Sequence, residues 1–356
     1  MNFARMIKSA RLEQGWTLAS LAITMSIDSA IISKVERGLR RATRSQVGQF
    51  IAVLHLSEKD AFTAWLSDKI LEELKDEQFA MEAFVVAEKE VKYLRKQQVE
   101  EANRLNTSFI DLVSQLDSLS AKWKAKKPLE GIQLEKLQEY FNVAYTYDSN
   151  RIEGNTLTLQ ETHLVVNEGL TIGGKSMQEH LEAVNHYEAI DYLQDLVKKK
   201  VKISERVIKE LHHLILKGID RENAGAYRSV PVIISGSAHK PPQPYLLARK
   251  MEELMEFYEA KKLVFHPVIL AAEMHLRLVT IHPFIDGNGR TSRLLMNLIL
   301  LQNGFTIANL KGTDNARLAY YRALENAQTD DEHNDFYKLI LETCVTSLKA
   351  HLEMVE

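Results

Sequence analysis

The sequence predicts an all-α protein with one small β-hairpin in its second half. Residues 49–127 contain neither glycine nor proline, and stretches such as LEELKDEQFAMEAFVVAEKEVKYLRKQQVEEANRL repeat apolar residues at three- and four-residue spacing. The same spacing resumes at Leu129 and has one interruption, VPVIISGSAHKPPQP at 230–244. A β-branched run, then small residues, then a proline cluster predicts a strand and a turn there.

Composition limits the classes of protein that this chain can be. It has 356 residues, 45% of them hydrophobic and 26% charged, with a formal net charge of −3. These values are ordinary for globular protein and exclude a strongly basic nucleic-acid coat. Cys344 is the only cysteine, so an intrachain disulfide and a cysteine-based metal site are excluded. Because we find no signal-peptide pattern and no long uncharged apolar stretch, we expect a cytoplasmic protein with no membrane partner.

Three parts are expected along the chain: an N-terminal domain at 1–58, a helical linker or arm at 59–128, and a larger domain at 129–356. The first part is basic, because residues 1–57 hold eight Lys and Arg against three acids. Gly15 and Gly38 mark breaks within it. We expect four short helices in it, at about 3–14, 17–24, 28–37 and 44–54, with Asp28 as the cap of the third.

The stretch LASLAITMSIDSAIISKVERG resembles the lambda-repressor-like (Xre-type) helix-turn-helix family over about 55 residues. It departs from that family at Leu18, where a glutamine is usual, so a protein-interaction module remains the alternative to a DNA-binding domain. A recognition helix followed by arginines favours DNA as a partner. The residues expected to contact it are Ser29, Ala30, Ser33, Lys34, Arg37, Arg40, Arg41 and Arg44.

The segment HPFIDGNGRTSR at 282–293 concentrates chemically active groups ahead of an amphipathic helix. Its Gly-Asn-Gly run predicts a nest of backbone amides at a helix N-terminus, which is an anion site. Arg290 and Arg293 follow at i and i+3, within reach of phosphate oxygens. Asp286 can hold Mg²⁺ that bridges those phosphates, and His282 offers a base that titrates near neutral pH. The residues of the nest are Gly287, Asn288 and Gly289.

This segment matches the Fic family motif H-x-F-x-[D/E]-G-N-G-R-x-x-R at every defined position, and the resemblance extends over about residues 145–345. It implies an all-α fold with a β-hairpin flap, and transfer of AMP from ATP to a Tyr, Thr or Ser hydroxyl of a target protein. His282 would then deprotonate the hydroxyl, Asp286 would hold Mg²⁺ or Mn²⁺, and the nest would bind the phosphates. Arg293 would clamp the outer phosphates, while Arg290 would support the loop.

Further residues acquire roles from the same resemblance. The flap would align the target backbone by strand addition. Tyr321 resembles the tyrosine that lines the adenine pocket, and Gln328 stands where relatives often carry asparagine. The residues expected in the flap are Ile233, Ile234, Ser235 and Gly236.

The segment SNRIEG at 149–154 resembles the inhibitory [S/T]-x-x-x-E-[G/N] helix of Fic relatives, through Ser149, Glu153 and Gly154. We therefore expect an inhibitory helix near 145–155 whose Glu153 pairs with Arg293 and restrains the activity within the same chain. In some relatives the same glutamate serves a reverse reaction that removes AMP from targets, and that activity stays open here.

Alternatives from other classes remain. The main one is a DNA-binding transcription regulator whose Fic domain senses ATP, although such a sensor would not need His282 beside the nest. The kinase-type Doc branch lacks the second arginine and has a degenerate nest, whereas Gly289 and Arg293 are intact here. A phosphocholine transferase has no support in the sequence. The expected partners are a hydroxyl-bearing target protein and DNA at residues 1–58, with a homodimer left open.

Overall fold

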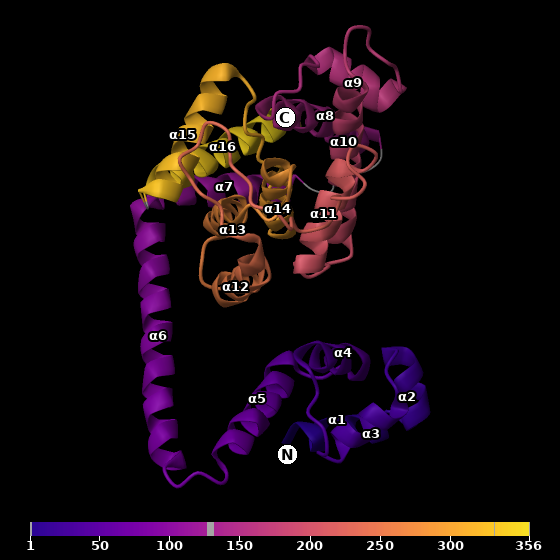
Figure 1. Ribbon diagram of the computed structural model, residues 1–356, viewed down its shortest axis with the longest axis vertical. Helices are drawn as coiled ribbons and strands as arrows, with labels where there is room; N and C mark the ends of the chain where they lie inside the picture. The colour runs from indigo at the N-terminus through magenta and orange to yellow at the C-terminus, as the bar shows by residue number, and fades with distance from the viewer. Residues whose placement is uncertain (1, 127–131, 331, 356) are drawn as a thin grey trace. The chain divides into compact units, whose positions relative to one another are not determined.

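The computed structural model describes residues 2–126, 132–330 and 332–355 of the chain. Its residues form two compact units, Met1–Arg95 and Lys96–Glu356. Every regular element among the described residues is helical (Figure 1). The predicted all-α class is therefore confirmed.

The first unit is a cluster of short helices around one core. Side chains cap its helices: Asp28, the predicted cap, accepts a hydrogen bond from the amide of Ala30 at 2.7 Å, and Thr43 forms a capping box with Gln46. The expected core face of the third helix is confirmed, since Ile32 and Val35 are buried. The helices are α1 (Asn2–Glu13), α2 (Leu18–Met25), α3 (Ser29–Glu36), α4 (Arg44–Leu54) and α5 (Glu58–Leu74).

The segment that follows residue 58 is divided between the two units. Helix α5 adds Ala61, Ala64 and Trp65 to the N-terminal core, so that core continues beyond the first four helices. Helix α6 (Ala80–Ser108) crosses the boundary between the units, and α7 (Ile110–Ala125) packs against α16 in the second unit. The expected helical character of this segment is confirmed.

The second unit surrounds two central helices, α13 (Pro267–Ile281) and α14 (Asn288–Gln302), drawn in orange in Figure 1. Both are buried on nearly all sides: apolar residues occupy most positions of α13, whereas α14 also buries polar residues such as Thr291 and Arg293. Around them lie α8 (Ile132–Ile152), α9 (Leu159–Glu168), α10 (Met177–Lys198), α11 (Glu205–Leu216), the 3₁₀ turn η1 (Pro244–Leu246), α12 (Leu247–Lys261), α15 (Asp314–Thr329) and α16 (Asn334–Glu353).

The predicted hairpin at 230–244 does not form as a pair of strands. The segment is an extended loop with one turn, where the amide of Ser237 bonds the carbonyl of Ile234 at 3.2 Å. The returning arm carries Pro241, Pro242 and Pro244, which have no N–H to donate to a ladder. Its polar groups bond elsewhere instead, as when the amide of Ala238 donates to Glu325 at 2.9 Å. We call residues 230–244 the flap.

Among the described residues, no single helix has the length and apolar character needed to cross a membrane. Helices α2 and α3, bent by 115° relative to each other, satisfy those criteria only when they are taken together.

Candidate functional site

A pocket of about 610 Å³ lies over the N-terminus of α14 in the second unit. It brings together segments that are far apart in the sequence: the end of α8, the flap, the loop between α13 and α14, and α15. Of the predicted site residues, the lining includes Glu153, Ile233, Ile234, Ser235, Gly236, His282, Asp286, Gly287, Asn288, Gly289, Tyr321 and Gln328.

The loop 282–288 is held in shape from within. Helix α13 ends at Ile281, and His282 takes the left-handed conformation at φ 50°. The side-chain amide of Asn288 bonds both the amide and the carbonyl of Phe284, at 3.0 and 2.9 Å. Phe284 is fully buried and stacks on His212, with ring centroids 3.6 Å apart. Phe284 thus anchors the loop in the core.

Two glycines let the backbone of this loop approach its neighbours. Gly287 has φ 73°, and a Cβ atom there would lie 3.2 Å from Ile215. A Cβ atom on Gly289 would lie 2.4 Å from the carboxylate of Glu153, closer than real contacts allow. Because α14 begins at Asn288, its first backbone N–H groups have no partners within the helix. The predicted backbone nest at a helix N-terminus is therefore present, and its geometry favours an anion.

His282 bonds the backbone through one of its two ring nitrogens. Its Nδ1 lies 3.2 Å from the carbonyl oxygen of Val279, which can only accept, so Nδ1 carries the proton and Nε2 keeps its lone pair. Burial lowers the pKa of His282, and the charge of Arg228 acts in the same direction. The imidazole is therefore neutral at pH 7, as proton abstraction requires.

Asp286 is the more exposed of two carboxylates at the nest, the other being that of Glu153. Its Oδ1 accepts from the amide of Gly287 at 2.6 Å, and its side chain is 59% exposed. The described residues contain no cluster of three or more His, Cys, Asp or Glu side chains that could hold a metal alone. Mg²⁺ is commonly held by one or two carboxylates together with substrate phosphates. The donor set therefore fits Mg²⁺ only when phosphates complete its shell.

Arg293 is fully buried on α14 and points at the end of α8. Its NH2 bonds Glu153 at 2.7 Å and the carbonyl of Ser149 at 2.9 Å, while Nε bonds the hydroxyl of Ser149 at 3.0 Å. Burial acts to lower the pKa of Arg293, but the carboxylate of Glu153 raises it overall. The predicted pairing of Glu153 with Arg293 is confirmed as a contact.

One nitrogen of this arginine has no hydrogen-bond partner among the described residues. NH1 of Arg293 is buried, and it lies 3.1 Å from the position of a Cβ on Gly289, beside the nest. A buried guanidinium N–H without a partner is costly, so this nitrogen fits an acceptor that the protein itself does not supply. A phosphate oxygen over the nest would meet that requirement.

Arg290 is turned away from the pocket. Its side chain is 3% exposed and bonds Asp286 at 3.2 Å, with Glu182 3.4 Å away. The expectation that both arginine forks can reach phosphate oxygens is therefore not met in this structure. A helix places residues i and i+3 on neighbouring but different faces, and α10, which carries Glu182, lies on the face of Arg290.

The far wall of the pocket comes from α15. Tyr321 is 38% exposed and donates its hydroxyl to the carbonyl of Ile152, the last residue of α8, at 2.8 Å. The side-chain nitrogen of Gln328 lies 3.2 Å from the hydroxyl of Thr280. Across from them is the flap, where Ile233 is 92% exposed.

Several residues of this site gave no signal in the sequence. Tyr320, Arg317 and Glu325 line the pocket on the same helix as Tyr321. Nε2 of His186 lies 2.9 Å from the hydroxyl oxygen of Ser149. Burial holds the pKa of His186 well below its usual range, so the ring stays neutral. An isolated arginine, histidine or tyrosine in a helical sequence has no spacing that distinguishes it, and only the fold assigns these residues to the site.

The residues predicted to contact DNA lie in the first unit, on α3, in the turn that follows it and, for Arg44, at the first position of α4. Ser29, Ala30 and Lys34 are exposed, and Ser33 is half-buried. Arg37 and Arg40 are exposed, whereas Arg41 pairs with Glu72 and Arg44 lies 4.9 Å from the ring of Phe62. The cationic side chains thus share one region, but two of the four arginines already have partners.

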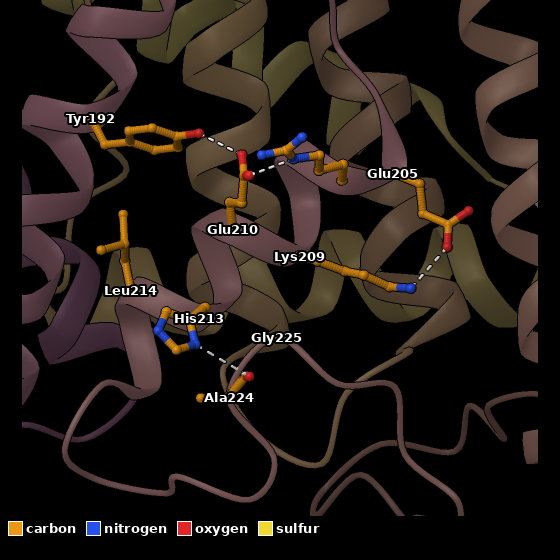
Figure 2. A pocket seen from close by; sticks show the side chains of 9 residues that line it. Tyr192, Glu205, Lys209, Glu210, His213, Leu214, Ala224 and Gly225 are labelled. Carbon is orange, nitrogen blue, oxygen red and sulfur yellow. Dashed lines mark hydrogen bonds and ion pairs between the residues drawn. The ribbon is translucent and has the colours of Figure 1, made fainter. Parts of the chain in front are cut away.

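A second pocket, of about 700 Å³, contains none of the predicted site residues. Figure 2 shows that α11 and the loop at Ala224–Gly225 line it. Its charged side chains pair with one another: Lys209 with Glu205 at 3.0 Å, and Glu210 with Arg206 and Tyr192. With those charges matched and most of the exposed lining apolar, it offers no chemistry comparable to that around His282.

Comparison with known proteins finds similarity to one family. Residues 202–300 match the Fic/DOC family. "Protein adenylyltransferase Fic" of Nematostella vectensis is 39% identical over 196 residues, covering 54% of this chain and 44% of that protein. The protein of the same name from Drosophila grimshawi is 36% identical over 226 residues, covering 63% of this chain and 44% of that protein. The chain thus spans less than half the length of these curated relatives.

Two solved structures share the fold. A Fic domain containing signaling protein from Bacteroides thetaiotaomicron is 28% identical, with a TM-score of 0.61, over 68% of this chain and 97% of that one. Fic-1 (residues 134–508) from C. elegans is 22% identical, with a TM-score of 0.62, over 98% of both chains. The matched residues 202–300 contain the flap, α13, most of α14 and the loop between these helices. Residues 202–300 of this chain are therefore similar to the Fic/DOC family.

Proposed function

We propose that this protein transfers AMP from ATP to a hydroxyl group of a target protein or of itself. The observation that carries the proposal is the pocket itself: His282, with its free Nε2, and the nest lie in its lining, and the unpaired NH1 of Arg293 is buried beside the nest. The curated relatives named protein adenylyltransferase support the same chemistry.

In the proposed reaction, the nest and Arg293 hold the phosphates of ATP, and Tyr321 and Gln328 face the base. Nε2 of His282 accepts the proton of the target hydroxyl, and that oxygen attacks the α-phosphorus. The bond from the α-phosphorus to the bridging oxygen breaks, and pyrophosphate leaves. Mg²⁺ or Mn²⁺ at Asp286 would neutralise charge on the phosphates.

Glu153 restrains this activity in our proposal. One guanidinium cannot give the same N–H to a carboxylate and to a phosphate, and NH2 of Arg293 is committed to Glu153 at 2.7 Å. The Glu153 carboxylate also overlaps the space above Gly289, where a phosphate would lie. ATP then binds without the full clamp. Whether the same carboxylate also promotes removal of AMP is a separate activity that the proposal leaves to measurement.

The test uses ATP labelled at either the α- or the γ-phosphate, incubated with the Glu153→Gly variant and a cell lysate. AMP transfer leaves the α-label on protein and releases the γ-label. Protein labelled from γ-labelled ATP would instead show kinase chemistry and would overturn the proposal. Glu325→Gln, a change of another acid in the same lining, is the matched control and should not release activity.

For the first unit we propose DNA binding through α3 and the arginines after it. The affinity of the isolated residues 1–95 for duplex DNA should fall steeply with salt, because phosphate contacts release counterions. Arg37→Ala and Arg40→Ala should flatten the salt dependence more than Arg41→Ala, since Arg41 already pairs with Glu72. No binding at low salt to duplexes from the protein's own promoter would favour the protein-interaction alternative.

A further inference from the structure

Arg228 is a buried cation in the loop between α11 and the flap. It is 3% exposed, and the described residues provide it with no carboxylate partner. Its pKa is lowered by burial, the one cause that acts on it. A buried charge without a counter-ion requires full hydrogen bonding to persist. The hydrogen-bond acceptors of Arg228 should therefore indicate its role.

All of its partners are backbone carbonyls, and they come from three segments. Nε donates to His282 at 2.8 Å, NH1 to Val230 at 3.0 Å and NH2 to Pro242 at 2.6 Å. The backbone amide of Arg228 adds a fourth bond, to Pro283 at 3.0 Å. One side chain thus joins the entry of the flap, the exit of the flap and the start of the loop that carries His282.

This connection replaces the strand ladder that the flap lacks. The two arms of the flap have no ladder between them, and the prolines of the returning arm cannot donate to one. A planar guanidinium has donors that point in several fixed directions, whereas an ammonium is a single point with a shorter reach. Arginine is therefore the side chain that can hold three carbonyls at once.

We propose that Arg228 is a positioning residue, which locks the flap against the catalytic loop so that a target hydroxyl on the flap meets Nε2 of His282. This inference deepens the proposed function and rests on it. Arg228 is not itself part of the pocket lining, and it contacts His282 at the carbonyl oxygen and not at the reacting Nε2. It acts through the carbonyl of His282, whose backbone stands in the left-handed conformation at φ 50° and so needs to be held.

The same cation affects the imidazole. Burial is the main cause that lowers the pKa of His282, and Arg228 and His239 lower it further, while Val279 and Glu153 raise it. Removal of the positive charge at position 228 should therefore raise the pKa of His282. A lysine keeps the charge but lacks the several donors of the guanidinium, so it should leave the pKa of His282 nearly unchanged. Comparing the two replacements separates the effect on position from the effect on charge.

The first test measures the flap without any assay of activity. In full-length Arg228→Lys, hydrogen exchange of a peptide across residues 229–243 should become at least tenfold faster, while peptides from α13 exchange as in the wild type. Arg249→Lys, on the exposed face of α12 beside Glu253, is the matched control. Unchanged exchange in the flap of a variant with native thermal stability would overturn the proposal.

The second test measures auto-AMPylation in the Glu153→Gly background, where Arg228→Lys should lower kcat/KM at least tenfold. Arg228→Met should lower it as well and should also move the acid limb of the pH–rate profile to higher pH, which the lysine variant should not. If kcat/KM falls only in proportion to the fraction of folded protein, and the acid limb of the pH–rate profile does not shift in Arg228→Met, the role of Arg228 is merely structural. If Glu153→Gly alone transfers no AMP, the proposed function fails, and the exchange experiment still decides whether Arg228 holds the flap.

Discussion

Two buried arginine–glutamate pairs, Arg11–Glu36 in the first unit and Arg293–Glu153 in the second, are built differently. In the first unit, Nε and NH2 of Arg11 bond both oxygens of Glu36 at 2.6 and 2.8 Å, and NH1 bonds the carbonyl of Trp16. Its three nitrogens are used, and the Glu36 side chain is 5% exposed. In the second unit, Arg293 leaves NH1 without a partner, and the Glu153 side chain is 33% exposed to the pocket.

We call the Arg11–Glu36 pair closed, because it joins α1 and α3 and has no donor left for a ligand, and we call the Arg293–Glu153 pair open. An open pair has a spare donor and a partner that solvent or substrate can displace. An arginine and a glutamate therefore hold two helices together in one unit and, in our proposal, regulate activity in the other. What separates them is how completely the surrounding protein satisfies the guanidinium.

The largest effect is expected from His282→Ala, which tests whether the open pair borders a reactive site at all. In the Glu153→Gly background, the loss of the base should reduce AMP transfer by about 10²–10⁴-fold. ATP binding, followed by calorimetry, should be nearly unchanged because the nest and Arg293 remain. Transfer that stays within a few-fold of the parent would assign the proton to another group.

The next effect is on stability, from breaking the closed pair. Glu36→Ala should leave the Arg11 charge buried and uncompensated, which lowers the unfolding free energy of the first unit by about 3 kcal/mol, at the low end for such pairs. Urea denaturation, followed by tryptophan fluorescence, measures the loss. AMP transfer by the second unit should not change. A loss below about 1 kcal/mol would mean that the pair behaves as an exposed one.

Removing the carboxylate of the open pair should raise the AMP-transfer activity. Glu153→Gly should raise auto-AMPylation at least tenfold, equivalent to about 1.4 kcal/mol, since Arg293 becomes available to ATP. Adding Arg293→Ala should cancel the gain, and the two changes should be strongly non-additive. Initial rates of both single variants and the double variant suffice. Equal rates for wild type and Glu153→Gly would place the restraint elsewhere.

The smallest effect concerns pH and again separates the units. Burial lowers the pKa of His275 to about 3 and those of His212 and His351 to about 4, against 6.5 when unfolded. The unfolded chain therefore takes up protons first as the pH falls, and stability present above pH 6.5 is lost below it. From pH 7 to 6 the loss should be about 0.7 kcal/mol per histidine.

Calorimetry at the two pH values checks this expectation. The transition of the second unit should move to lower temperature, whereas the first unit, whose single histidine His55 is exposed, should move less. Equal shifts for both transitions would show that the buried histidines are not responsible. Restoration of the second transition on return to pH 7 is the control for irreversible damage.

Much of the fold could be anticipated because its signals are local. Asp28 caps α3, Gly15 and Gly38 follow the ends of helices, and the apolar spacing marks the core faces. The flap was the exception. Its β-branched run favoured a strand, but pairing needs a partner with free N–H groups, and Pro241 and Pro242 deny it one. Whether a strand has a neighbour that can pair with it depends on the folded chain.

The candidate site divides in the same way. The sequence alone determined the all-α class, the nest with its acid and histidine, and, through resemblance, Glu153 as the partner of Arg293, because those groups are close along the chain or belong to a recognisable pattern. Only the tertiary structure decided that Arg290 turns to Glu182, that NH1 of Arg293 is left unpaired, and that Arg228 holds the flap. Those facts depend on which distant carbonyls and carboxylates fill the space around each guanidinium. A linear sequence does not encode that information in any spacing.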